Sequence, residues 1–345
     1  MKGIVFLGDR KLELMDFPDP TPGPRDVVLE IKASGMCGTD LGLYRRSAAA
    51  VQAGPLWIGG HEPCGVVAAV GSAVTEREAR VGDRVMDHHY EGCGVCRHCK
   101  SGWTQNCDEG AIIYGNAGGH GAHAKYMVVP AHTLVPLPDE LSFAAGAAIA
   151  CGTGTAYGAL KRLGLEGDET IAIYGQGPVG LSGTVLAHAM GARVIAVDPS
   201  AERRIVALEK GAAVAIDPTA DDPVAAIKDL THGKGADKAL DATSSAEARA
   251  NAVRSVRTFG SAVFVGIGGE VRLDVLRDLI RRQMTLVGHQ TFSKMGQDDC
   301  ARFIAERKID IDSLFTNHWR IDQAEEAYTL FDQQKTGKGV FTAFD

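Results

Sequence analysis

The sequence predicts a two-part α/β protein, in which a β-rich domain comes first and a doubly wound parallel sheet follows. Its 345 residues exceed the length at which a single hydrophobic core usually divides, so two domains are expected. Residues 1–148 are rich in Gly, Pro and short β-like runs, whereas residues 149–289 alternate apolar strand-like runs with helical stretches. That alternation is typical of parallel strands joined by crossover helices.

The first part contains runs that are too short for helices and are separated by turn-forming residues. Pro, Gly and Asp interrupt any regular pattern in the segments PDPTPGPRD and EGCGVC. This pattern predicts a partly irregular all-β domain with long loops. Strands are expected at VVLEIKASG, GVVAAVG, GDRVM and AKYMVVP, residues 27–35, 65–71, 82–86 and 124–130.

The middle part predicts six parallel strands with helices between them, and a tail follows. The strands are expected at TIAIY, RVIAV, AVAI, KALD, SAVFV and MTLVG, and the helices at residues 178–192, 200–211 and 245–257. The tail from residue 290 contains two helix-like stretches and a closing strand, at residues 296–308, 322–334 and 339–344. We find no internal repeat beyond the β-α alternation.

Composition and charge exclude several classes of protein. The net charge is −7 and no basic run occurs, which argues against a nucleic-acid-binding surface. Hydrophobic residues make up 45% of the chain, yet no apolar stretch approaches the ~20 residues that a membrane span needs. The N-terminal run MKGIVFLGDRKLEL turns polar too soon for a secretory signal. We therefore expect a cytoplasmic protein with no nucleic-acid or membrane partner.

Four of the eight cysteines lie close together in the spacing C-x2-C-x2-C-x7-C. Four thiolates at this spacing suit a closed tetrahedral zinc site, with Zn–S distances of ~2.3 Å and no position left for a substrate. Such clustering in a long chain argues for metal ligands rather than for a disulfide framework. The predicted structural zinc ligands are Cys93, Cys96, Cys99 and Cys107.

Three further residues form a second candidate metal set, namely Cys37 in GMCGTD, His61 in GGHEPCG and Cys151 in ACGTGTAYG. Two thiolates and one imidazole would leave the fourth position of a zinc ion open. Sequence spacing does not show that the three residues converge. Each one alone is also explained as a buried cysteine or as a core histidine. Their joint presence beside a dinucleotide-type fold favours the metal site.

A glycine-rich loop, GQGPVG, follows the strand-like run TIAIY and opens a helix, which is the context that dinucleotide binding requires. Gly175 would permit the tight turn, Gly177 the approach of the pyrophosphate and Gly180 close packing of helix and strand. Pro178 suits the first helical turn, and the free N–H groups there, with Val179 next in the turn, would face phosphate.

Asp198 ends the next strand, eighteen residues after Gly180. A carboxylate at this place can accept hydrogen bonds from both ribose hydroxyls and repels a 2′-phosphate, so NAD is predicted in preference to NADP. Arg203 either flanks the ribose or faces solvent. Zinc has no redox chemistry of its own, so a zinc ion that favours deprotonation of an alcohol requires the nicotinamide to accept the hydride.

Taken together, both cysteine-containing sets and the glycine loop occur in an order that resembles the medium-chain zinc-dependent alcohol dehydrogenases. The resemblance implies a GroES-like catalytic domain from residues 1 to 148, completed by residues 290–345. It also implies a Rossmann NAD-binding domain over residues 149–289 and a homo-oligomer, with a tetramer favoured over a dimer.

The resemblance also implies roles for single residues. Cys37, His61 and Cys151 would hold the catalytic zinc, and Glu62 resembles an acidic neighbour that approaches the metal as an exchanging ligand. Asp40 resembles the carboxylate that orients the zinc-bound imidazole. Thr39 resembles the hydroxyl that relays the substrate proton. The cofactor contacts implied beyond the glycine loop are Thr155, Gly266 and Ile267.

The sequence departs from the family pattern at Gly42, where many members have a histidine that ends the proton relay. The proton released by Thr39 would then leave through water or another group. The substrate pocket is expected to include Trp57, His89 and Tyr114, and a polar lining such as His89 favours a polyol or an aryl alcohol over a plain alkanol. The identity of the alcohol, whether primary, secondary or polyol, stays open.

Two alternative functions are compatible with parts of the pattern. One is a zinc-free quinone or enone reductase on the same fold, against which Cys37, His61 and Cys151 count. The other is a zinc-ribbon interaction protein that senses NADH, in which the cysteine cluster binds a partner. Metal analysis and alcohol-dependent formation of NADH separate both from a dehydrogenase.

Overall fold

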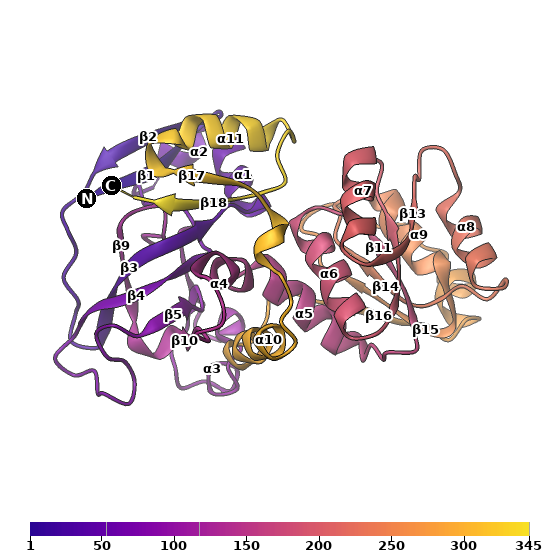
Figure 1. The fold of residues 1–345 in the computed structure, drawn as a ribbon, viewed down its shortest axis with the longest axis horizontal. Helices are drawn as coiled ribbons and strands as arrows, with labels where there is room; N and C mark the ends of the chain where they lie inside the picture. The colour runs from indigo at the N-terminus through magenta and orange to yellow at the C-terminus, as the bar shows by residue number, and fades with distance from the viewer. Residues whose placement is uncertain (53, 117, 345) are drawn as a thin grey trace. The chain divides into compact units, whose positions relative to one another are not determined.

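A computed structural model of the chain describes residues 1–52, 54–116 and 118–344. The chain forms two compact units, one made of Met1–Gly154 with Phe292–Asp345 and the other of Thr155–Thr291. We call them the β-rich unit and the α/β unit. The junctions expected from the sequence lay a few residues earlier, at 148/149 and 289/290. Both ends of the chain belong to the β-rich unit (Figure 1).

A seven-stranded sheet forms the centre of the β-rich unit. Its strands follow the order β10-β5-β4-β3-β18-β17, and β9 also pairs with β3. The long strand β3 is the hub, since it pairs antiparallel with β4, β9 and β18. The bounds are β3 (Asp26–Gly35), β4 (Pro63–Val70), β5 (Arg84–Asp87), β9 (Tyr126–Pro130), β10 (Leu134–Pro136), β17 (Phe315–Arg320) and β18 (Lys338–Ala343).

The C-terminal segment completes the sheet that the N-terminal segment begins. Strand β18 pairs antiparallel with β3 through Val340↔Gly35 and Phe341↔Ser34, and parallel with β17. The expected closing strand is therefore present. Strand β17 was not predicted, because its sequence FTNHWR is mostly polar and only the buried Phe315 and Trp319 give it an inner face.

Two small sheets and several helices surround this sheet. Helix α11 packs against strand β2 (Figure 1), and the rings of Phe6 and Tyr328 meet edge to face with centroids 4.9 Å apart. The small sheets are β1 (Lys2–Gly8) with β2 (Lys11–Asp16), and β6 (Tyr90–Glu91) with β7 (Ile112–Tyr114) and β8 (Gly118–Gly119). The α-helices are α1 (Gly38–Arg45), α2 (Ala48–Gln52), α3 (Arg97–Lys100), α4 (Phe143–Ile149), α10 (Lys294–Glu306) and α11 (Ala324–Asp332), with 3₁₀ turns at Thr104–Asn106, Ala131–Thr133, Asp312–Leu314 and Ile321–Gln323.

The α/β unit is built on a six-stranded parallel sheet of order β13-β12-β11-β14-β15-β16. This order confirms the predicted doubly wound fold. The chain adds strands to one side of β11 as far as β13 and then to the other side from β14 onward, and such sheets bind ligands at the point between β11 and β14 where the order changes. The central strand TIAIY is buried along nearly its whole length, as expected for a strand covered on both faces. The strands are β11 (Thr170–Tyr174), β12 (Arg193–Val197), β13 (Ala212–Ile216), β14 (Ala236–Asp241), β15 (Val256–Phe264) and β16 (Thr285–Gly288).

The helices of this unit begin at residues with recognisable capping chemistry. The hydroxyls of Ser200 and Ser245 accept backbone N–H groups at the starts of α7 and α9, and Asp222 does so at the start of α8. Helices α5 and α8 and the π-helix were not among the predicted helices, and the last two are short. The bounds are α5 (Gly152–Leu163), α6 (Pro178–Ala189), α7 (Ala201–Glu209), α8 (Pro223–Leu230), α9 (Ala246–Ser255) and the π-helix Val275–Ile280.

Among the described residues no single helix is both long and apolar enough to cross a membrane. Helices α4 and α5, which meet at a bend of 51°, reach that length and composition only when they are taken together.

Candidate active site

Cys37, His61, Glu62 and Cys151 converge in the β-rich unit, and their ligand atoms all lie within 4.8 Å of one another. Strand pairing explains the convergence of the first three, because Ser34 of β3 lies opposite Pro63 of β4. Cys37 follows β3 and caps helix α1, while His61 and Glu62 directly precede β4. Cys151 lies in the turn between α4 and α5.

The spacing of the donor atoms fits a zinc ion. The two thiol sulfurs of Cys37 and Cys151 are 3.9 Å apart, and Cys151 Sγ lies 3.4 Å from His61 Nε2. A tetrahedral ion with ordinary Zn–S and Zn–N bonds would place these pairs of atoms about 3.8 and about 3.5 Å apart. Two sulfurs and an imidazole nitrogen are donors that zinc prefers. The residues present therefore fit the metal that the sequence predicts.

Asp40 fixes the orientation of the histidine. Its Oδ1 lies 2.9 Å from His61 Nδ1, and its Oδ2 accepts the backbone N–H of Cys37 at 2.9 Å. The Asp40 carboxylate is completely buried, so these two contacts are not diluted by water. With Nδ1 occupied by the carboxylate, Nε2 is the nitrogen left for a metal ion. The sequence had assigned Asp40 this orienting role.

The two thiols and the imidazole shift one another's pKa values. A hydrogen bond from Cys151 and the nearby His61 lower the pKa of the Cys37 thiol well below its usual value, against the effect of burial. The pKa of the Cys151 thiol is raised, because it donates to Cys37 and is buried. Burial disfavours the imidazolium form of His61, but Asp40 and Cys37 outweigh it and raise its pKa. One thiolate is thus stabilised before any metal binds.

Glu62 presents one paired and one unpaired oxygen. Oε2 accepts a hydrogen bond from Lys338 Nζ at 2.5 Å, whereas Oε1 is buried and has no hydrogen-bond partner among the described residues. Burial raises the pKa of the Glu62 carboxyl to about 7, and the Lys338 ammonium acts in the opposite direction. An orphaned buried carboxylate oxygen beside two thiols and an imidazole is a further sign that a cation belongs there.

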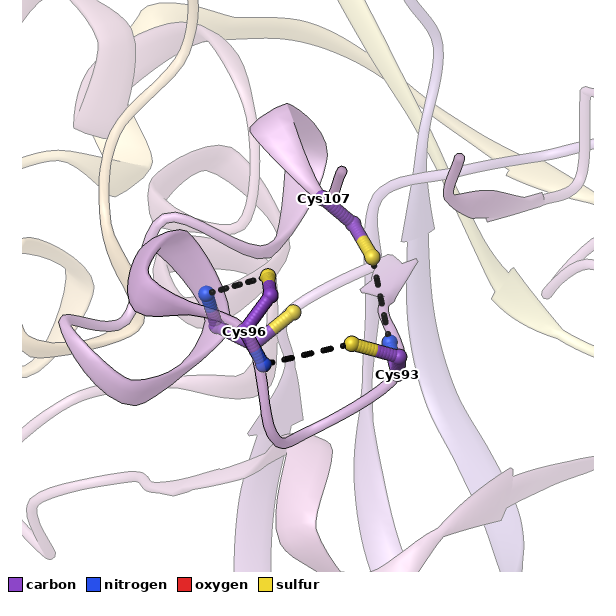
Figure 2. A group of neighbouring side chains, drawn as sticks. Cys93, Cys96 and Cys107 are labelled. Carbon is purple, nitrogen blue, oxygen red and sulfur yellow. Dashed lines mark hydrogen bonds between the residues drawn. The ribbon is translucent and has the colours of Figure 1, made fainter. Parts of the chain in front are cut away.

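A second group contains only cysteines, and its sulfurs also lie within 4.8 Å of one another. Figure 2 shows the side chains of Cys93, Cys96 and Cys107 turned toward a common space. Each of these sulfurs accepts a backbone N–H at 3.3 to 3.4 Å, and the N–H groups of Cys99 and Asp108 lower the pKa of the Cys96 thiol to about 6. These N–H groups thus favour thiolate at Cys96, whereas burial raises the pKa of the Cys99 thiol to about 12. Four sulfurs this close together fit a closed zinc site. The group is Cys93, Cys96, Cys99 and Cys107, and none of the eight cysteines, all of which are described, forms a disulfide.

The glycine-rich loop lies between β11 and α6, at the point where the sheet order reverses. Gly175 has φ +84°, a conformation that favours glycine. A Cβ at Gly180 would lie 1.7 Å from the carbonyl oxygen of Gly175, whereas a Cβ at Gly177 would meet no atom within 4 Å. The loop therefore packs closely at Gly180 and leaves open space at Gly177. Helix α6 begins at Pro178, with Val179 in its first turn, so free N–H groups face this space.

Asp198 lies directly after β12 and is held by the backbone. Its Oδ2 accepts the N–H of Gln176 at 2.6 Å and its Oδ1 that of Ser200 at 2.9 Å. These bonds fix the carboxylate beside the glycine loop with further lone pairs available. The guanidinium of Arg203 lies 3.9 Å from Asp198 Oδ2 and is about one-third exposed, so it flanks the carboxylate rather than covering it.

The remaining predicted cofactor residues belong to the α/β unit. Thr155, the first residue of the α/β unit, is buried. A Cβ at Gly266 would lie 1.4 Å from the carbonyl oxygen of Thr243, so the chain passes very close to the loop after β14. Ile267 is 77% exposed, which is high for an apolar side chain and leaves it accessible to a ligand. Their contacts with a cofactor remain predictions.

The three predicted pocket residues differ in their surroundings. His89 lies next to the metal group, since its ring centroid is 5.1 Å from that of His61. Its Nδ1 is within hydrogen-bond distance, 3.1 Å, of the carbonyl oxygen of Ala150. The hydroxyl of Tyr114 donates instead to Glu91 at 2.5 Å. Trp57 lines a cavity of about 60 Å³ whose walls include none of the metal-binding candidates. His89 is thus in contact with His61 of the metal group, and the roles of all three residues in a substrate pocket stay predictions.

Thr39 and Gly42 both lie on helix α1. Thr39 Oγ1 is 3.9 Å from the sulfur of Cys37, so its hydroxyl is beside the metal group. Gly42 is exposed, and a Cβ there would meet no atom within 4 Å. The position that holds a histidine in many family members is therefore open space in this chain.

Lys338 is the residue near the metal group that the sequence analysis missed. It is the first residue of β18 and its side chain is 2% exposed. From the sequence it is one of two lysines in the terminal run QQKTGKGVF. The signal available was its position at the start of an apolar strand, but the strand pairing that brings it to Glu62 is not visible in a sequence.

The fold and the metal-binding group define a zinc-type oxidoreductase with a nicotinamide-binding domain, and comparison with known protein families agrees. Residues 23–139 match the family model described as alcohol dehydrogenase GroES-like domain, and residues 178–306 match the zinc-binding dehydrogenase model. The chain belongs to the medium-chain zinc-dependent alcohol dehydrogenase family. The predicted GroES-like and Rossmann folds are thereby confirmed.

Two curated relatives cover nearly the whole chain. An uncharacterized zinc-type alcohol dehydrogenase-like protein, YphC of Escherichia coli K12, is 36% identical over 99% of this chain and 98% of its own length. The L-threonine 3-dehydrogenase of Pyrococcus furiosus is 32% identical over 95% and 94%, respectively. The relatives therefore agree on the class of enzyme and differ in what is known of their substrates.

Solved structures give the same fold with different cofactors. The alcohol dehydrogenase TADH from Thermus sp. ATN1 superposes with a TM-score of 0.90 at 26% identity, over 99% of this chain and 100% of that one. A structure described as a zinc-binding dehydrogenase from Sinorhizobium meliloti 1021 bound to NADP has a TM-score of 0.88 at 26% identity, over 99% and 98%. The acetophenone reductase of Geotrichum candidum in complex with NAD has a TM-score of 0.84 at 27% identity, over 100% and 97%.

Proposed function

We propose that this protein is an NAD-dependent zinc dehydrogenase that oxidises an alcohol to the corresponding aldehyde or ketone. The observation that carries the proposal is the convergence of Cys37, His61, Glu62 and Cys151 within 4.8 Å in a chain that also has a dinucleotide loop. We propose two zinc ions per chain, a catalytic one at this group and a structural one at the four-cysteine group. A zinc-free quinone or enone reductase would have no use for two thiols and an imidazole in this arrangement.

The chain's own residues would orient the metal and handle the proton. Asp40 holds His61 so that Nε2 faces the metal position, and Cys37 and Cys151 supply thiolates. Zinc, when bound, acts as a Lewis acid that lowers the pKa of an alcohol hydroxyl. Thr39 accepts the hydroxyl proton and donates its own onward. A bound NAD would supply the hydride acceptor for the carbinol carbon, which balances as one NADH and one proton for each carbonyl group formed.

His89 supports a substrate with a second polar group. Burial and the neighbouring His61 and His88 lower the pKa of His89 well below its usual value, so the ring is neutral. If Nδ1–H is donated to the carbonyl of Ala150, Nε2 becomes a hydrogen-bond acceptor. An acceptor next to the metal group suits a second hydroxyl, so we propose a polyol or another hydroxyl-bearing alcohol ahead of a plain alkanol.

A substrate screen tests this function. Absorbance at 340 nm is followed with primary, secondary, polyol and aryl alcohols and L-threonine, with NAD and NADP in parallel. The proposal expects NADH formation with at least one hydroxyl-bearing substrate. No alcohol-dependent reduction of either cofactor by a zinc-loaded protein would count against it.

Replacing Asp198 with alanine should change the cofactor preference. The ribose hydrogen bonds and the repulsion of a 2′-phosphate disappear together, so KM for NAD should rise about tenfold or more and the preference over NADP should shrink. Steady-state kinetics with both cofactors measure the change. Asp168→Ala, which alters an exposed carboxylate before β11, is the control. A wild-type enzyme that prefers NADP would contradict our interpretation of Asp198.

Removing the hydroxyl of Thr39 should slow turnover. Thr39→Ala should lower kcat by about 10²-fold or more, the usual scale of a proton-transfer contribution, whereas Thr39→Ser should retain most of it. His89→Asn tests the competing idea that His89 takes the proton. A neutral Thr39→Ala variant together with a large loss in His89→Asn would move the proton transfer to His89.

We propose that copies of the chain associate, as the family resemblance suggests. Strand β16 is an edge of the six-stranded sheet and is largely exposed, as are Leu286, Val275 and Ile280. Unpaired edges with apolar neighbours are usually covered in stable proteins. Light scattering after gel filtration should give a mass of two or four chains, and Leu286→Lys should lower it. A monomer at micromolar concentration would contradict the proposal.

A further inference from the structure

Lys338 is a buried cation whose side chain has almost no contact with water. Its side chain is 2% exposed, and its Nζ donates to Glu62 Oε2 at 2.5 Å and to the carbonyl oxygen of Met36 at 3.4 Å. The ring of Phe315 lies 5.8 Å from the same nitrogen. A buried ammonium is tolerated only when an anion and hydrogen-bond acceptors compensate it, and Glu62 is that anion.

The backbone reserves a place for the Glu62 carboxylate beside this lysine. A Cβ at Gly35 would lie 1.8 Å from Glu62 Oε2, so only a glycine at this position of β3 leaves room for the carboxylate. Strand β18 pairs with β3 at Gly35 and thereby brings Lys338 to the same spot. Three segments distant in sequence thus meet to hold one oxygen of Glu62. The other oxygen, Oε1, is buried without a partner among the described residues and belongs to the metal group.

Charge accounting shows what the lysine does. A zinc ion with the thiolates of Cys37 and Cys151 and a neutral His61 has no net charge, and the buried Asp40 carboxylate beside His61 already adds one negative charge. Glu62 adds one negative charge to a buried place, and Lys338 cancels it. Without Lys338, the carboxylate would be an uncompensated buried anion, and the zinc ion would be the remaining cation within the group.

We propose that Lys338 is a positioning residue that holds Glu62 off the fourth coordination position of the catalytic zinc and so keeps that position open for substrate. The inference rests on the proposed catalytic zinc site and adds the element that decides between an open and a closed coordination sphere. Removing the positive charge would let Glu62 close the site as a fourth ligand, because the pull of Lys338 on Oε2 would be gone.

The test replaces the catalytic zinc with Co²⁺ and titrates the protein with imidazole, which occupies an open coordination position. The visible d–d and thiolate-to-cobalt bands report the ligand set independently of turnover. The variants are Lys338→Met, Lys338→Arg, the double variant Lys338→Met with Glu62→Gln, and the control Lys238→Met, which breaks the Lys238–Glu169 ion pair of the α/β unit.

The expected pattern separates charge from packing. Lys338→Met should bind imidazole at least tenfold more weakly than wild type, the scale at which residues outside the ligand set affect metal sites. Its bands before titration should already differ from those of wild type. Lys338→Arg keeps the charge and should restore imidazole binding, and removing the Glu62 charge in the double variant should restore it as well. Lys238→Met should behave as wild type.

Two results would overturn the inference, and they differ in what else they overturn. Wild-type protein without thiolate-to-cobalt bands would remove the catalytic metal site and this inference with it. Normal bands in wild type, with Lys338→Met binding imidazole within twofold of it, would overturn this inference alone. Should Lys338→Met fail to fold, Lys338→Gln removes the charge with a smaller loss of polarity, and the same comparison applies.

Discussion

Cys37→Ser should lose nearly all dehydrogenase activity while the protein stays folded. A serine hydroxyl is a poor zinc ligand at neutral pH, so the catalytic group would be left with one thiolate. Losing a metal that contributes about 4 kcal/mol of transition-state stabilisation corresponds to a fall in kcat/KM of about a thousandfold. The fold should persist, because Cys37 caps helix α1 and serine is a good N-cap residue.

The measurement combines kinetics, zinc content and thermal unfolding. Zinc content should fall by about one ion per chain and Tm should change by only a few degrees. Cys300→Ala is the matched control, because Cys300 is a buried cysteine of α10 that belongs to neither cysteine group, and it should retain activity. A fully active Cys37→Ser enzyme would refute the catalytic assignment.

Cys96→Ser should have the opposite profile, with a large loss of stability. Structural zinc binding contributes about 10–16 kcal/mol of apparent free energy in small zinc domains, so losing one of four ligands should cost roughly 3 kcal/mol or more. The loop from Cys93 to Cys107 has little regular structure, namely the short helix α3 and one 3₁₀ turn. A few hydrogen bonds also tie it to neighbouring segments, among them Thr104 to the carbonyl oxygen of Tyr90 and Gln105 to that of Phe292. Activity should decline because the protein unfolds, not because the chemical step is slower.

Calorimetry and limited proteolysis separate these effects. We expect a Tm lower by several degrees, cleavage within residues 93–107 and a kcat per folded molecule close to wild type. Lys100→Ala, in the same loop but outside the sulfur group, should leave Tm unchanged. A Cys96→Ser protein with wild-type Tm and two zinc ions would contradict the structural role.

Much of the fold was predictable because its signals are local. Strand TIAIY, the glycine loop and the helix that starts at Pro178 follow from apolar runs, turn residues and helix-start chemistry over a few positions. Strand β17 was not predictable in this way. Its polar sequence becomes a strand because β18 offers it a partner, and such tertiary pairing overrides local preference.

In the candidate site, too, some residues were predictable from the sequence and others were not. Residue type and order were enough to select Cys37, His61 and Cys151, because few other functions need those donors in one chain with a dinucleotide loop. The role of Lys338 depends on two strand pairings and on the absence of a side chain at Gly35, neither of which has a sequence signature. Tyr114 was selected for the pocket by its position alone; the structure adds that its hydroxyl donates to Glu91, and its place in the pocket stays a prediction.

The central claim is that one chain holds two zinc ions, one at each group. Crystals of the zinc-loaded protein, measured above and below the zinc absorption edge, locate the ions directly. The account predicts two anomalous peaks per chain, one among the four cysteines and one bound by Cys37, His61 and Cys151. A single peak at the four cysteines, with the second group empty at full zinc loading, would contradict it.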